Sequence, residues 1–230
     1  MFITKKIIKA EFIRRPNRFQ GYVIIDGEET LVHVPNTGRC KEILIPGTTV
    51  ILREEGNPLR KTRYDLIGGY KGERFINIDS QIPNKVVEEA LLQKRIEGLN
   101  KYSIVEREKT FGNSRFDFRL RTEKGEEYYL EVKGVTLEEN GETRFPDAPT
   151  ERGRKHLLEL IDVKKQQKGA GVLFLIQMED VDHFKPNDGT DKAFGDALRL
   201  AYKNGVDIFA YDCSIGENFI TLKNKIRIIL

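Results

Sequence analysis

Two acidic residues and a lysine are spaced along two neighbouring β-rich segments of the chain. Asp117 lies within the alternating segment 114–118, and the next such segment contains Glu131-Val132-Lys133. Because side chains alternate along a strand, Asp117 should project opposite the apolar face of its strand, and Glu131 and Lys133 should share one face. A hairpin that closes through 123–126 would bring both carboxylates and the ammonium together. Such a group can hold a hard divalent cation and attack a phosphodiester.

Each member of this group has a role in that chemistry. Asp117 and Glu131 are predicted ligands of Mg²⁺ or Mn²⁺, and the Val132 carbonyl is a further candidate ligand. Lys133 would orient the attacking water and offset the developing negative charge. On spacing alone, solvated charges on an amphipathic hairpin explain the pattern as well. The apolar strands and helices downstream favour the catalytic interpretation, because they supply a scaffold for such a site.

Other polar residues could assist this group. A helix expected over 85–99 carries Glu88 and Glu89, and periodicity does not decide which of them could reach the metal; a solvated helix face explains at least one. His156 is more often a surface residue than an acid–base group. Gln177 ends an apolar strand, where a supporting polar role is plausible. His183 falls in an expected polar loop and is predicted to have no role.

The elements that must position these residues form two groups. Within the first 80 residues, turn residues separate five expected strands, at 19–25, 30–34, 48–52, 64–67 and 75–78. Five short strands in this length predict a small β-barrel of the OB type, placed in a domain over 1–81.

The remaining residues, 82–230, predict a second domain. After the helix over 85–99, the pattern indicates strands at 104–108, 115–120 and 128–135, a helix at 150–168, a strand at 171–176, a helix at 191–204, a strand at 206–211 and a closing strand within 219–230. This order predicts a mixed sheet flanked by helices. The expected fold class is α/β, or α+β for the whole chain.

Charge is nearly balanced over the whole chain, with 39 basic and 36 acidic residues and a net charge of +3. A nucleic-acid-binding face must therefore come from local clusters of basic residues. One cluster lies beside Phe12 and Phe19, and another opens the helix that follows Pro149, where a phosphate could bind. A solvated rim explains both clusters as well. The candidate nucleic-acid contacts are Arg14, Arg15, Arg18, Asn36, Arg39, Arg115, Arg152, Arg154 and Lys155.

Cys40 and Cys213 lie far apart without metal-ligand spacing, so reduced thiols are expected. The N-terminus lacks the apolar core of a signal peptide, and the longest apolar run, 172–176, is too short to cross a bilayer. We expect a cytoplasmic protein with no membrane partner.

Taken together, these motifs resemble the SfsA family, the sugar fermentation stimulation proteins. The matching blocks are residues 12–15, 33–38, 57–58, 83–84, 114–118, 131–137 and 145–157. The resemblance implies an OB-like domain joined to a restriction-endonuclease-like domain whose PD-(D/E)xK pattern falls on Asp117, Glu131 and Lys133. It also implies DNA binding and places the family's helical acidic position at Glu89. Two departures are Gly134 and Arg39, where serine is common.

The sequence thus predicts a DNA-binding protein with a nuclease-like site that uses Mg²⁺ or Mn²⁺. The oligomeric state is left open, and a homodimer would let two sites act on two strands. The alternative is a non-cleaving DNA-binding regulator linked to sugar metabolism. Paired carboxylates also serve glycosidases, but an adjacent lysine and basic surroundings suit a phosphate better.

Overall fold

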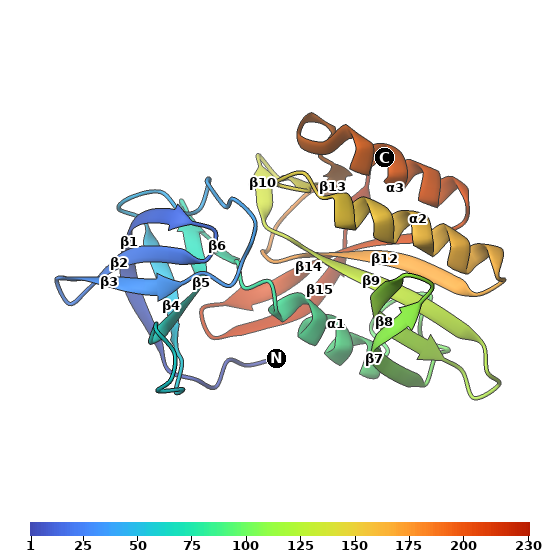
Figure 1. Cartoon of the computed structure of the whole chain (residues 1–230), viewed down its shortest axis with the longest axis horizontal. Coiled ribbons are helices and arrows are strands. Elements are labelled where there is room, and N and C mark those ends of the chain that lie inside the picture. The colour runs from blue at the N-terminus through green and yellow to red at the C-terminus, as the bar shows by residue number, and fades with distance from the viewer.

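The computed structural model describes residues 1–230, and its chain folds into two β-rich units that lie side by side (Figure 1). The first unit is a barrel whose strands lie in the order β3-β2-β1-β4-β5-β6, with an additional pairing between β3 and β5. Its strands are β1 (Ile7–Asn17), β2 (Gln20–Ile25), β3 (Glu28–His33), β4 (Thr49–Glu54), β5 (Tyr64–Lys71) and β6 (Arg74–Asn77). The predicted OB-type barrel is confirmed.

The barrel contains one strand more than the sequence predicted, because β1 was missed. Adjacent apolar residues, a pair of arginines and Pro16 obscure the period-two alternation of this segment. β1 pairs with β4 over its first half and with β2 over its second half, and its register with β2 shifts between Phe12 and Arg14. Such a bulge bends a strand from one partner to the next, as barrel closure requires.

The second unit is built on a six-stranded mixed sheet in the order β15-β14-β12-β9-β8-β7. A four-stranded sheet, β10-β11-β13-β16, packs beside it. The strands are β7 (Ile104–Phe111), β8 (Ser114–Arg121), β9 (Glu127–Val135), β10 (Leu137–Glu139), β11 (Glu142–Phe145), β12 (Gly169–Ile176), β13 (His183–Pro186), β14 (Asp207–Gly216), β15 (Phe219–Lys225) and β16 (Arg227–Ile228). The helices are α1 (Ile82–Leu92), α2 (Glu151–Lys165) and α3 (Asp188–Lys203).

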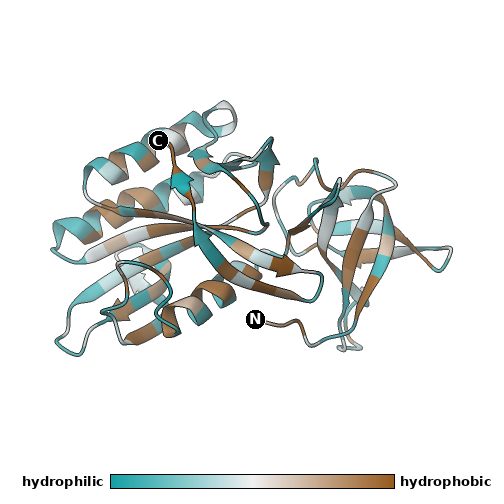
Figure 2. Ribbon diagram, turned by 180° about the vertical axis from the view of Figure 1, so that it is seen from behind, coloured by the Kyte–Doolittle hydropathy of each residue, from teal (hydrophilic) through white to brown (hydrophobic).

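Burial on both faces explains the apolar sequence of the central strand β12. Leu173 and Leu175 belong to the apolar cluster that contains the buried face of α1, whereas Val172 and Phe174 belong to the cluster that contains α2 and α3. In Figure 2, hydrophobic residues are concentrated in α1 and the central strands, while α2 and α3 alternate between hydrophobic and hydrophilic. The predicted mixed sheet with helices on its faces is confirmed.

Some predicted boundaries were wrong. Helix α1 begins at Ile82, with Pro83 in its first turn, and it ends before Lys94, whose φ of 56° is not helical. The short strands β10, β11 and β13 were missed because three or four residues carry little periodicity. His183 therefore lies in a strand and not in a loop, and its Nε2 lies 2.9 Å from Glu142 Oε2.

Buried polar contacts join the two units. The amide of Gln177, which directly follows β12, donates from Nε2 to Asn77 Oδ1 at 2.9 Å, and the Asn77 N–H donates to the Gln177 carbonyl. Glu138 of β10 forms ion pairs with Lys71 (2.8 Å) and Arg74 (2.7 Å) of the barrel. Because these contacts hold the junction from both sides, the two units keep a fixed position relative to each other. None of the helices is long and apolar enough to cross a lipid bilayer.

Candidate metal and nucleic-acid site

Asp117 lies where β8 and β9 separate. The antiparallel ladder of the predicted hairpin runs from Arg121↔Glu127 to Phe118↔Leu130 and stops there. Beyond it, the Val132 N–H donates to Asp117 Oδ2 at 2.8 Å, so a side-chain carboxylate occupies the place of a backbone acceptor. Asn84, in the first turn of α1, donates from Nδ2 to Asp117 Oδ1 at 2.7 Å. Both oxygens of this carboxylate are therefore oriented by the protein.

Glu131 has one oxygen with two partners and one oxygen with none. Lys133 Nζ and His156 Nδ1 each lie 2.5 Å from Glu131 Oε1, and the Oε2 atom is buried without a hydrogen-bond partner. Arg152 Nε donates to His156 Nε2 at 3.5 Å, so we assign the proton to Nδ1, which donates to the carboxylate. The predicted proximity of Glu131 and Lys133 is thus present, and a buried histidine from α2 joins them.

Burial and charge affect the two carboxylates differently. Burial, together with the negative charge of Glu131, raises the pKa of Asp117 from 3.8 to about 6. The hydrogen bonds from Val132 and Asn84 and the positive charge of Lys133 oppose this rise. Burial alone would also raise the pKa of Glu131, but the hydrogen bond from His156 and the charge of Lys133 outweigh it and lower this pKa. Glu131 is firmly ionised, while Asp117 exchanges its proton close to neutral pH.

The donor set fits a hard divalent cation. The buried Glu131 Oε2 is a carboxylate oxygen without a hydrogen-bond donor, and leaving it so is costly unless a cation approaches it. No group of three or more His, Cys, Asp or Glu side chains is arranged so that it could hold a metal ion, here or elsewhere in the chain. Mg²⁺ commonly binds to one or two carboxylates and keeps several waters, so Asp117 and Glu131 satisfy its requirement without a third acid.

The structure does not bring the predicted ligand Glu89 to these carboxylates. Glu89 Oε2 lies 2.9 Å from the amino group of Met1, and Glu88 Oε2 lies 3.3 Å from Arg107. Asn84 is the α1 residue that contacts Asp117, and a residue five positions later is rotated by about 140° around a helix. Helix α1 therefore supplies an amide to the site, while Val132 takes part through its N–H.

Sequence reasoning missed the roles of Asn84 and His156. His156 is 4 % exposed, whereas the sequence favoured a surface position for it. Its approach to Glu131 depends on how α2 packs across β9. The one local signal was Thr150, whose hydroxyl accepts a hydrogen bond from the Gly153 N–H and so fixes where α2 begins.

Three of the predicted nucleic-acid contacts are engaged within the barrel. The Arg15 guanidinium donates to the carbonyls of Arg18, Asn36, Gly38 and Arg39 at 2.6–2.8 Å. The Asn36 amide donates to the Ile78 carbonyl, and its Oδ1 accepts from the Gly38 N–H. Arg14 pairs with a glutamate of β3 and stacks over the ring of Tyr22. Arg15 and Asn36 therefore shape the loop over 36–39.

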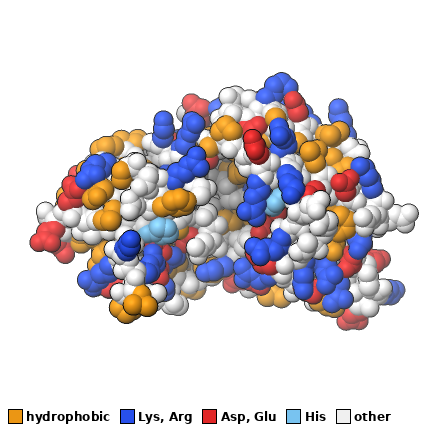
Figure 3. Space-filling view, viewed as in Figure 1, with side chains coloured by type: hydrophobic (Ala, Val, Ile, Leu, Met, Phe, Trp, Pro, Cys, Tyr) orange, Lys and Arg blue, Asp and Glu red, His pale blue; other side chains and the backbone are white.

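The other predicted contacts are more exposed. Arg115 pairs with Glu108 at 2.8 Å, and Lys155 Nζ donates to the Asn113 carbonyl at 3.1 Å. Figure 3 shows a hollow between the two units, with Lys and Arg side chains gathered on both of its sides. The predicted contacts that are exposed include Arg18, which lines a pocket between the units, Arg39 from the barrel, and Arg152, Arg154 and Lys155 from the start of α2.

Comparison with known proteins assigns both units. The model of the "SfsA N-terminal OB domain" matches residues 13–78, and that of the "Sugar fermentation stimulation protein RE domain" matches residues 81–219. The chain belongs to the SfsA family. The resemblance noted in the sequence is confirmed, and with it the restriction-endonuclease-like character of the second unit.

Relatives cover the whole chain. A sugar fermentation stimulation protein homolog of Clostridium tetani is 70% identical over 100% of both chains, and one of Clostridium acetobutylicum is 65% identical over 96% of each. The solved structure of Pyrococcus furiosus SfsA in complex with Ca²⁺ superposes with a TM-score of 0.89 and 29% identity, covering 100% of both chains.

Proposed function

We propose that this SfsA-family protein is a metal-dependent nuclease that hydrolyses phosphodiester bonds of DNA, with Mg²⁺ or Mn²⁺ as its cofactor. The observation that carries the proposal is the state of Glu131. Two donors hold its Oε1, the buried Oε2 has no partner, and Glu131 is near enough to Asp117 for its charge to raise the pKa of that residue. A carboxylate fixed by one oxygen, with the other free, is oriented as a metal ligand.

A bound Mg²⁺ or Mn²⁺ would neutralise phosphate charge and lower the pKa of a bound water. Asp117 and Glu131 Oε2 would hold this ion, with a predicted contribution from the Val132 carbonyl. Asn84 and the Val132 N–H fix both oxygens of Asp117, so little reorganisation is needed when the ion binds. His156 fixes the orientation of Glu131 through its hydrogen bond to Oε1, the oxygen that would not bind the ion.

Lys133 is the cationic group of the site. Its side chain is 16 % exposed and its ammonium contacts Glu131 Oε1, so it is paired with a carboxylate of the site and still partly accessible to solvent. From this position we assign it to orient the attacking water and to stabilise negative charge that develops on the phosphate. The barrel and the start of α2 would grip the strand through their exposed basic residues.

The comparisons support the use of a divalent cation. The Pyrococcus furiosus relative, which resembles this chain over its full length, was solved in complex with Ca²⁺. Ca²⁺ and Mg²⁺ both take oxygen ligands, and Ca²⁺ often occupies carboxylate sites without supporting the same chemistry.

The test is a panel of single-stranded, duplex, bulged and RNA substrates incubated with Mg²⁺, with Mn²⁺ or with EDTA. We expect metal-dependent cleavage by the wild type, and loss of cleavage with retained binding in Asp117→Ala and Lys133→Ala. Asp196→Ala, which removes an exposed carboxylate from α3, is the matched control and should cleave normally. If the wild type cuts no substrate with either metal, the nuclease proposal is wrong.

A non-cleaving DNA-binding protein is the second candidate. One observation favours it: no group of three or more acidic, histidine or cysteine side chains that could hold a metal ion forms around Asp117 and Glu131, and Glu131 already forms an ion pair with Lys133. Salt-dependent binding that ignores divalent metal and survives Asp117→Asn would support this candidate.

A further inference from the structure

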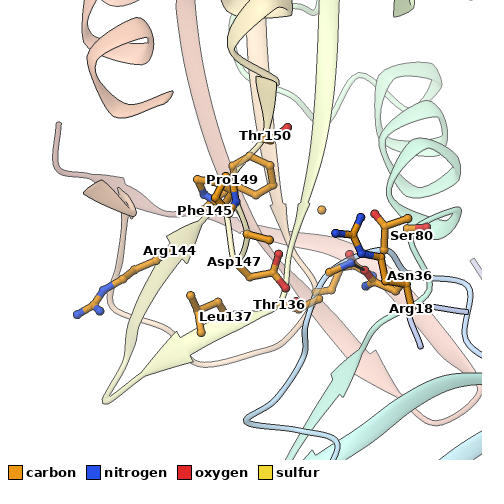
Figure 4. Close-up of a pocket in the computed structure, with 16 residues that line it drawn as sticks. Arg18, Asn36, Ser80, Thr136, Leu137, Arg144, Phe145, Asp147, Pro149 and Thr150 are labelled. Carbon is orange, nitrogen blue, oxygen red and sulfur yellow. Dashed lines mark hydrogen bonds between the residues drawn. The ribbon is translucent and has the colours of Figure 1, made fainter. Parts of the chain in front are cut away.

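A polar pocket lies between the barrel and the second unit, beside the candidate site. Its volume is about 270 Å³, and only three of its sixteen lining residues are hydrophobic. Figure 4 shows Arg18, Asn36 and Ser80 on the barrel side, facing Asp147 and Pro149 across the opening. Both units are needed to form it, so it exists only while the junction between them is intact.

The pocket and the carboxylates share two structural elements. Gly134, which lines the pocket, directly follows Lys133 in β9. Thr150, which also lines it, caps the helix that carries His156. The pocket and the candidate site are therefore connected through β9 and the start of α2.

A buried glutamine of the pocket wall has one side-chain atom that receives no hydrogen bond from the protein. Gln177 is 1 % exposed, and its Nε2 donates to Asn77 Oδ1 and to the Asp79 carbonyl. No protein group donates to its Oε1, although this residue lines the cavity. The space in front of Oε1 is kept open by Gly134, because a Cβ there would overlap Oε1 and lie 2.8 Å from Pro83 Cγ. An amide oxygen on the pocket wall, with its own Nε2 already engaged, can accept a hydrogen bond from an occupant of the pocket.

The other residues that line the pocket indicate what kind of molecule it could bind. Asp147 offers a second acceptor, and its Oδ2 already receives the Arg39 N–H at 2.7 Å. Arg18 at the rim is exposed and forms no ion pair, so its guanidinium is available to an anion. Phe145 and Pro149 add apolar surface. The acceptors inside the pocket suit hydrogen-bond donors on a flat ring, which could also pack against the apolar wall. The cation at the rim suits a phosphate attached to that ring.

We propose that this pocket receives one unpaired nucleotide of a nucleic-acid strand bound across the hollow. The inference deepens the proposed nuclease function and rests on it for the position of the strand. An unpaired base presents the donors of its pairing edge, whereas a base pair has already used them. The volume lies at the lower limit of ligand pockets, which are about 300–1,000 Å³, and is too small for a base pair. The favoured substrate therefore carries an unpaired or extruded nucleotide.

Binding in EDTA tests the pocket without requiring cleavage. Three fluorescently labelled duplexes of equal length are compared by anisotropy: fully paired, with one unpaired adenine nucleotide, and with an abasic site in its place. We expect the wild type to bind the adenine bulge about tenfold more tightly than the other two, as base stacking and hydrogen bonding in a pocket allow. A 2-aminopurine at the bulge should change its fluorescence on binding.

Two variants should abolish this preference. Gly134→Ala fills the space in front of Gln177 Oε1, and Arg18→Gln removes the rim cation. The matched controls are Gly56→Ala, where a Cβ meets nothing within 4 Å, and Arg227→Gln, an exposed arginine without an ion pair. Both controls should keep the preference. Melting temperatures verify that each variant is folded, and Arg18→Gln tests the pocket without adding a Cβ beside Pro83.

Several results would overturn the pocket. The proposal is wrong if the wild type binds all three duplexes equally, or if it binds the adenine bulge no better than the abasic duplex. It is also wrong if the preference persists in both pocket variants. Failure of the nuclease proposal looks different. If the protein prefers the adenine bulge but does not cleave in Mg²⁺ or Mn²⁺, the pocket proposal stands and the nuclease proposal fails. If it cleaves but shows no preference, the nuclease proposal stands and the pocket proposal fails.

Discussion

Glu131 is held at Oε1 by Lys133 and by His156, and only the histidine is itself buried enough to fix the direction of the carboxylate. His156 is in turn fixed by Arg152 and by an edge-on contact with Phe116. A histidine of this kind acts on the metal ligand and not on the substrate. We therefore regard His156 as a positioning residue whose loss lets Oε2 turn away from the cation.

The prediction is that His156→Ala weakens binding of Mn²⁺ or Ca²⁺ by about 10–100-fold, the usual effect of removing a group that orients a metal ligand. Isothermal titration calorimetry measures this affinity without any substrate. His156→Gln should recover part of it, because the amide can still donate to Glu131. His183→Ala is the control, since it breaks another His–Glu pair, with 2.9 Å between its atoms, outside the site. Equal losses in both alanine variants would contradict the positioning role.

The raised pKa of Asp117 makes a testable contribution to stability. Its carboxyl has a pKa of about 6 in the folded protein against an ordinary value of 3.8, so the folded state binds this proton more tightly than the unfolded chain. Stability from this group is therefore complete below the unfolded pKa and is lost as the pH rises through the folded one. The loss amounts to about 3 kcal/mol, because each pKa unit corresponds to about 1.4 kcal/mol.

Asp117→Asn isolates this contribution, since asparagine does not titrate. Urea unfolding of the wild type and of the variant, between about pH 4 and about pH 8, gives the difference in their unfolding free energies. We expect the variant to gain stability relative to the wild type as the pH rises, by up to about 3 kcal/mol. A difference that stays constant with pH would mean that Asp117 ionises normally in the folded state.

At the residue scale, the sequence predicted the part of the site that strand alternation controls. Glu131 and Lys133 share a face because they are two residues apart in one strand. Asn84 and His156 were not predicted in their roles, because both reach the carboxylates from helices whose packing angles leave no trace in the local pattern. Glu89 shows the same limit: its place in α1 was expected, but its rotation away from Asp117 was not.

At the scale of elements, α2 links the two halves of the site. Its first turn carries exposed basic residues, and its second turn carries His156. The position of both depends on where the helix begins, which Thr150 sets by accepting the Gly153 N–H at 3.1 Å. The sequence predicted this helix well because a capping threonine, an apolar stripe and two basic residues in the last turn all agree.

We expect Thr150→Ala to lower the free energy of unfolding by about 1 kcal/mol, since one N–H at the helix start loses its acceptor. Urea denaturation measures the loss. Thr150→Ser keeps the hydroxyl and should stay close to the wild type. If both variants lost the same stability, the methyl group of Thr150 rather than the cap would be responsible.

Strands were predicted less evenly than helices. β8, β9 and β12 were found because they alternate or are uniformly apolar over eight or nine residues. β1 was missed although it is the longest strand, because its bulges break the alternation where it changes partners. The short strands β10, β11 and β13 were missed because three or four residues show little periodicity, and β13 in addition pairs with strands far along the chain.

At the scale of the whole molecule, the contact between the units could not be read from the sequence. Gln177 meets Asn77, and Glu138 meets Lys71, across separations of 100 and 67 residues. The apolar cluster that contains the barrel core also contains α2 and α3. The two units therefore present the sides of one hollow in a fixed relation, and the exposed basic residues on the two sides face a common space (Figure 3).

This arrangement predicts that DNA touches both units at once, and the salt dependence of binding reports it. For duplex DNA, the slope of log K against log salt concentration falls by about 0.9 for every phosphate contact that is lost. We expect the pair Arg18→Gln and Arg39→Gln on the barrel, and the pair Arg152→Gln and Arg154→Gln on α2, each to reduce the slope by up to about 2. Lys192→Gln with Lys203→Gln on α3 removes the same charge elsewhere and should leave the slope unchanged. A slope that responds to only one of the two pairs would place the DNA on a single unit, and the hollow would then not be its binding site.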